Sequence, residues 1–77
     1  MTVFALVTDD SEGVNLRLYA RESDMQDEYV RYANKNSETL MKSNILDFED
    51  NFEFVCEHGL DDGAHIHWFE ETIHENE

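Results

Sequence analysis

The sequence predicts a small α+β domain, in which two β-hairpins form an antiparallel sheet and one helix or a kinked pair of helices packs on one face. Apolar residues alternate with polar ones near both ends of the chain, a helix-capping pattern begins at Ser23, and a glycine-containing turn lies within each hairpin. The 77 residues make one domain in the order β-β-α-β-β, with a frayed acidic tail expected at 74–77.

The first hairpin is expected over residues 1–20. Val3–Val7 is a short apolar run rich in residues that favour strands. The cluster Asp9–Gly13 predicts a turn, because Gly13 adopts a positive φ without strain. A second strand follows, since apolar side chains recur at every second position, as in a half-buried strand: Val14, Leu16, Leu18 and Ala20.

The helical region is expected over residues 23–42. Ser23 and Gln26 have the spacing of a capping box. Three acids fall in the first turns, where the helix dipole favours anions: Asp24, Asp27 and Glu28. The polar stretch 34–37 leaves two alternatives open. Either the helix continues to about Lys42, or it ends there and Ser37 caps a second, short helix.

The second hairpin is expected over residues 52–73, after a connector at 44–51 with room for one helical turn. Phe52, Phe54 and Cys56 alternate with polar residues and predict a third strand. Residues 61–63, Asp-Asp-Gly, predict a three-residue loop. A fourth strand follows at Ala64, Ile66 and Trp68. In this register Cys56 is a core residue opposite Trp68, His58 faces Ile66, and Glu57 pairs with His67 on the outer face.

Cysteine and histidine spacing in this hairpin suggests a less favoured alternative, a zinc site. Its candidate ligands are Cys56, His58, His65 and His67. Bringing them to one face requires a one-residue register shift, which would expose Ile66 and Trp68.

No third group orients a nucleophile or base, and the chain is too small to enclose much of a pocket, so neither an enzyme nor a cofactor is expected. The acids at 47, 49 and 50 lack the glycine and spacing of an EF-hand calcium loop.

Charge is the strongest functional signal in the chain. The formal net charge is −14, and no lysine or arginine follows Lys42, although eleven carboxylates do. Such a field repels nucleic acid and anionic membranes, so direct binding to nucleic acid or to a membrane is not expected. The same field attracts basic protein surfaces. The single cysteine, the lack of a basic leader and the lack of an apolar run of roughly 20 residues predict a cytoplasmic protein.

These features predict a small acidic inhibitory protein that occupies the basic surface of a nucleic-acid-binding or nucleic-acid-processing partner. In size, acidity and lack of a catalytic motif it resembles phage-encoded anti-restriction and anti-CRISPR proteins, which act in the host cytoplasm, although no motif assigns it to a family. Alternatives are the zinc domain and a regulatory or assembly subunit with an acidic solubilising surface, and an exposed sheet edge would permit a homodimer. The candidate partner-binding residues are Asp24, Asp27, Glu28, Asp47, Glu49, Asp50, Glu53, Glu57, Asp61, Asp62, Glu70 and Glu71.

Overall fold

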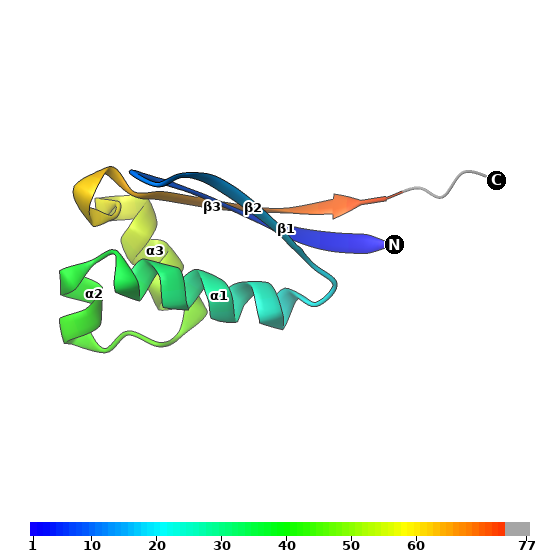
Figure 1. Cartoon of the computed structure of the whole chain (residues 1–77). Helices are drawn as coiled ribbons and strands as arrows, with labels where there is room; N and C mark the ends of the chain where they lie inside the picture. The colour runs from blue at the N-terminus through cyan, green and yellow to red at the C-terminus, as the bar shows by residue number, and fades with distance from the viewer. Residues whose placement is uncertain (74–77) are drawn as a thin grey trace.

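A computed structural model describes residues 1–73, in which three helices cover one side of a three-stranded antiparallel sheet (Figure 1). The strand order is β2-β1-β3, so the N-terminal strand is central. The elements are β1 (Thr2–Asp10), β2 (Gly13–Tyr19), α1 (Glu22–Lys35), α2 (Glu38–Ser43), α3 (Phe48–His58), the 3₁₀ turn η1 (Asp61–Gly63) and β3 (His65–Thr72). The α+β class is confirmed. The tail predicted at 74–77 lies outside the described residues.

The turn between β1 and β2 is closed by side-chain and glycine chemistry. The Glu12 amide donates a hydrogen bond to Asp10 Oδ1 (2.9 Å), and Gly13 has a φ of 121°. A short acidic side chain that accepts from the backbone two residues later stabilises a tight turn. This turn sets the register of the hairpin, in which Ala5 lies beside Leu18 and Leu6 lies beside Arg17.

The predicted second hairpin over 52–73 is wrong, because residues 48–58 form helix α3. Asp47 caps this helix by accepting a hydrogen bond from the Asp50 amide (3.2 Å). The segment fits two patterns. A strand pattern appears in the alternation of Phe52, Phe54 and Cys56, and a helix pattern appears in the i, i+4, i+7 spacing of Phe48, Phe52 and Val55. Strand β3 therefore pairs with β1 rather than with a strand at 52–57.

The predicted cross-strand neighbours of this segment are wrong for the same reason. Cys56 is exposed on α3 and is not a core residue. His58 and Glu57 are also exposed on the helix, so they do not face Ile66 and His67 across a ladder. On β3 the actual neighbours come from β1, with Ile66 beside Thr8, His67 beside Val7 and Trp68 beside Leu6.

The helical region forms a pair of helices, which is the second of the two alternatives. Helix α1 begins at Glu22, after an N-cap at Arg21 that makes no side-chain capping bond, so the capping box predicted at Ser23 is wrong. Ser37 does cap α2, since its Oγ accepts a hydrogen bond from the Leu40 amide (3.3 Å). Helix α2 ends at Ser43, and its C-cap Asn44 takes the left-handed conformation with a φ of 53°.

An aromatic cluster joins α1, α3 and the sheet. Tyr29 on α1 is 1% exposed, and its ring lies edge-on to Phe48 at 5.2 Å between centroids. Phe48 stacks on Phe52 at 5.8 Å, and both rings meet Trp68 of β3 edge-on at 6.0 and 6.2 Å. Edge-to-face packing suits the charge distribution of aromatic rings. The cluster fixes α3 against the rest of the core.

Two asparagines hold the connector between α2 and α3. The side-chain amides of Asn34 and Asn51 donate hydrogen bonds to the Ile45 carbonyl at 3.1 and 3.4 Å. Asn51 is fully buried, on the inner side of α3. Because side chains of α1 and α3 donate hydrogen bonds to the same carbonyl, the connector orients α3 as well as joining it to α2.

Candidate partner-binding surface

The outer side of α3 bears a row of four exposed carboxylates, here called the α3 stripe: Glu49, Asp50, Glu53 and Glu57. Residues three or four apart lie side by side on a helix, and four residues rise about 6 Å along its axis. The opposite side of α3 packs inward through Phe48 and Asn51. The stripe is therefore held on a regular element that is anchored to the core.

Lysine and arginine side chains of residues 1–73 do not neutralise the stripe. Within residues 1–73 no lysine or arginine nitrogen lies within 4.0 Å of its carboxylates, and the one ionic contact joins Glu57 to His58 at 3.7 Å. Like charges spaced i, i+4 on a helix destabilise it by about 0.2–0.5 kcal/mol per pair. The helix dipole favours anions in the first turn of α3. Beyond that turn, the repulsion within the stripe reduces the stability of the helix.

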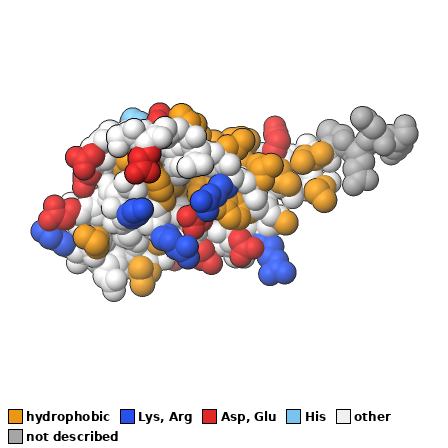
Figure 2. Space-filling model, in the orientation of Figure 1, with side chains coloured by type: hydrophobic (Ala, Val, Ile, Leu, Met, Phe, Trp, Pro, Cys, Tyr) orange, Lys and Arg blue, Asp and Glu red, His pale blue; other side chains and the backbone are white. Residues whose placement is uncertain are grey.

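The five basic residues lie elsewhere, on β2, α1, α2 and the link between β2 and α1. Glu28 of α1 contacts Arg31 at 3.3 Å and Arg17 of β2 at 4.0 Å. Lys42 contacts Glu38 at 2.8 Å. Figure 2 shows basic and acidic side chains interspersed on the face over α1 and α2. The charge is therefore polarised, with mixed signs around α1 and only carboxylates on the outer side of α3.

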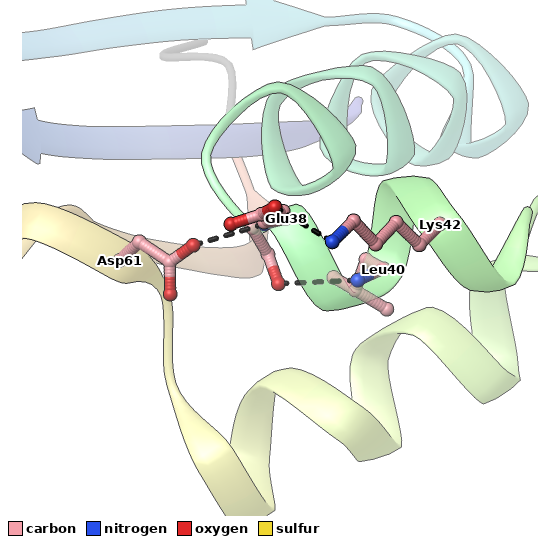
Figure 3. Close-up of polar contacts among 5 residues, drawn as sticks. Glu38, Leu40, Lys42 and Asp61 are labelled. Carbon is pink, nitrogen blue, oxygen red and sulfur yellow. Dashed lines mark hydrogen bonds and ion pairs between the residues drawn. The ribbon is translucent and has the colours of Figure 1, made fainter.

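Three of the predicted partner-binding acids have structural roles instead. Asp47 caps α3, and Glu28 is paired with two arginines. Asp61 Oδ2 accepts a hydrogen bond from the Glu38 amide (2.9 Å) at the start of α2, as Figure 3 shows. Such a carboxylate satisfies an amide that the first turn of a helix leaves free. These three acids make contacts within the fold, although Asp47 and Asp61 remain exposed.

The structure does not bring the remaining predicted acids to one surface. Asp24 and Asp27 are exposed on α1, among the basic residues. Asp62 is exposed in η1, with a φ of 56°. Glu70 and Glu71 are consecutive on β3, so their side chains point to opposite faces of the sheet. Of the predicted set, only the α3 stripe forms a continuous row.

The predicted zinc ligands are divided between a helix and a strand. Cys56 and His58 lie on α3, whereas His65 and His67 lie on β3. Cys56, His65 and His67 line a groove of about 480 Å³ between the two elements, and the His58 ring packs against Phe54 at 4.7 Å instead. In the described part of the chain, no three histidine, cysteine or acidic side chains lie close enough together to hold a metal ion.

A hydrogen bond links the hairpin to α1 on the side away from the stripe. The Tyr32 hydroxyl donates to Asp10 Oδ2 at 2.8 Å. This bond, with the one from the Glu12 amide, lowers the pKa of Asp10 below its ordinary 3.8. Burial, and then the hydrogen bond to Asp10, raise the pKa of Tyr32 to about 12.

Replacing Tyr32 with phenylalanine is expected to raise the pKa of Asp10 towards 3.8, because the charged carboxylate loses its main donor. A depressed acid pKa stabilises the fold above the unfolded pKa, and this contribution is lost as pH falls through the folded pKa. The variant should therefore be less stable than the wild type at neutral pH, and this difference in the free energy of unfolding should disappear in strong acid. NMR titration of the Asp10 carboxyl measures the shift, with Tyr19→Phe as control. An unchanged Asp10 pKa in Tyr32→Phe would contradict the assignment.

No protein-family model, curated protein or solved structure matches this chain. Among residues 1–73, no helix is both long enough and apolar enough to cross a membrane. The sequence identifies all four acids of the stripe, but its alternation places Glu53 and Glu57 on a strand and leaves Glu49 and Asp50 in the connector at 44–51. The signals that place them on one side of a helix are the Asp47 cap and the helical spacing of Phe48, Phe52 and Val55.

Proposed function

We propose that this protein is an acidic inhibitor that uses the α3 stripe to occupy the basic, nucleic-acid-binding surface of a partner protein. The observation that supports it is the row of four exposed carboxylates without a lysine or arginine partner in residues 1–73. A surface that binds nucleic acid presents lysine and arginine to successive phosphates. Host nucleases that phages must block, such as restriction and CRISPR enzymes, have surfaces of this kind.

The anchoring of α3 gives the stripe an advantage over a flexible acidic tail. The aromatic cluster and Asn51 fix the helix, so its carboxylates are positioned before the partner arrives. A preorganised surface loses less conformational entropy on binding. The net charge of −14 also attracts a cationic partner over a long range and raises the association rate.

Capture from a nuclease-treated bacterial lysate tests the proposal, with a neutral-stripe variant that combines Glu49→Gln, Asp50→Asn, Glu53→Gln and Glu57→Gln. The matched control removes an equal number of charges outside the stripe, through Glu12→Gln in the β1–β2 turn and Glu22→Gln, Asp24→Asn and Asp27→Asn on α1. We expect the wild type and the control to retain nucleic-acid-binding proteins at low salt. The neutral-stripe variant should retain at least tenfold less, since the charges that meet the partner are gone.

Two further measurements decide whether the captured protein is held as proposed. Raising the salt from 0.05 to 0.3 M should release it, because exposed charges are screened beyond a Debye length of about 10 Å at 0.1 M. Duplex DNA should compete with the acidic protein for the same partner. Retention that is insensitive to salt, or equal in the neutral-stripe variant, would contradict the proposal.

A further inference from the structure

The sheet has a second face, which the helices do not cover (Figure 1). The core side chains of the strands, such as Leu6 and its neighbour Trp68, point towards the helices. Successive side chains of a strand point to opposite faces, so the residues between these core positions point away from the helices. These residues form what is here called the open face: Val3, Ala5 and Val7 of β1, Val14, Leu16 and Leu18 of β2, and His67 and Phe69 of β3. Its centre is apolar on all three strands.

Strand β2 presents its apolar side to solvent. Val14, Leu16 and Leu18 are 71, 59 and 62% exposed, whereas Arg17 from the same strand turns towards Glu28 of α1. A strand with this alternation is expected to bury its apolar row, and nothing within residues 1–73 covers it. A continuous apolar patch of this kind marks an interaction surface.

Among residues 1–73 the charged side chains of the three strands avoid the centre of the open face. Along its rows the ionised side chains are Asp9 at one end and Glu71 at the other, and none of the three strands places a lysine or arginine there. The α3 stripe belongs to the helical layer, on the opposite side of the sheet. A strongly basic partner would therefore find little to pair with at the centre of this face, whereas a second neutral apolar face would match it.

We propose that the open face is a homodimer interface, in which two copies pack sheet against sheet. A two-fold axis in the plane of the interface makes the same patch self-complementary. The product has four layers, helices, sheet, sheet and helices, with the two sheets packed as in a β-sandwich. Both α3 stripes remain on the outside, so dimerisation removes the apolar row from water without bringing the stripes together. This proposal is independent of the function proposed for the stripe.

The size of the face predicts how tightly the copies associate. Three strands about 4.8 Å apart and seven residues long, at about 3.3 Å per residue, have a planar footprint of roughly 300 Å². With the relief of its side chains, a pair of such faces buries on the order of 1,000 Å² in total, which is at the small end of specific interfaces. The dimer should therefore be reversible and depend on protein concentration.

Analytical ultracentrifugation of the wild type across a concentration series is the first test. We expect the mass to rise from that of one chain, 9.1 kDa, towards twice that value. Apolar burial drives this association, and salt screens the repulsion between the two acidic chains, so higher salt should favour the dimer. That response is opposite to the one expected for partner binding by the stripe. A wild type that stays monomeric at every concentration would overturn the proposal.

Leu16→Asp is the decisive variant, and Met41→Asp on α2 is its matched control, since the two side chains are 59 and 61% exposed. Both should keep the circular dichroism spectrum of the wild type, because neither is in the core. Leu16→Asp should be monomeric at concentrations where Met41→Asp is dimeric. A dimer that survives Leu16→Asp would place the contact at a strand edge. A monomeric wild type whose Leu16→Asp variant loses a heterologous partner would assign the face to that partner. Either result overturns the proposal.

Discussion

Replacing Tyr29 with alanine is expected to bring the free energy of unfolding close to zero, so that a large fraction of the protein is unfolded at 25 °C. Tyr29 is 1% exposed at the centre of the aromatic cluster, and truncating such a side chain costs about 3–5 kcal/mol. A domain of this size has only ~3–5 kcal/mol of net stability, so the loss removes most of it. Urea denaturation followed by circular dichroism measures the difference in the free energy of unfolding.

The control for this prediction is Leu46→Ala, a truncation at a residue that is 68% exposed. Its free energy of unfolding should stay within about 0.5 kcal/mol of the wild type. Burial raises the pKa of the Tyr29 hydroxyl, so that group is neutral at the pH of the experiment and no charge effect enters the comparison. Equal stability of the two variants would show that the aromatic cluster does not hold the core together.

Local chemistry predicted the parts of the fold that depend on neighbouring residues. The turn at Gly13 and the alternation that follows it specify the β1–β2 hairpin, and Ser37 caps α2 through an amide three residues away. In each case the partners lie within a few positions in sequence. The α+β class follows from those local patterns.

The second half of the chain was mispredicted because one segment fits two periodicities. Phe52, Phe54 and Cys56 alternate as in a strand, while Phe48, Phe52 and Val55 repeat as in a helix. The helix prevails because it brings Phe48 and Phe52 against Tyr29 of α1 and Trp68 of β3. Those contacts span distant parts of the chain, so no local pattern could reveal them.

The same limit applies to the surfaces. A period of two shows that Val14, Leu16 and Leu18 share a face, but not that this face points away from the helices. Similarly, the sequence identifies every carboxylate without showing that Asp61 holds a helix start in another part of the chain. Tertiary contacts determine which acids form a row on the surface and which make hydrogen bonds within the fold.

Changing Asn51 to aspartate is expected to destabilise the protein by about 3–4 kcal/mol at pH 7, although the two side chains have almost the same shape. Asn51 is fully buried, and its amide donates to the Ile45 carbonyl, which would repel a carboxylate. Burial raises the pKa of such a carboxyl from ~3.9 to roughly 6–7, and each unit is worth about 1.36 kcal/mol. Urea denaturation at pH 7 should therefore show a variant that retains little of the wild-type stability.

The pH dependence separates this charge effect from a packing defect. Because the folded pKa of the new carboxyl is raised, the penalty is present above that pKa and diminishes as pH falls through it towards the unfolded value. The variant should therefore regain stability relative to the wild type between about pH 7 and pH 4. Asn15→Asp makes the same change at an exposed position of β2 and should show no such recovery. A deficit in Asn51→Asp that stays constant with pH would contradict the assignment. Recovery on acidification would show that α3 tolerates carboxylates on its outer side and excludes them from its inner side.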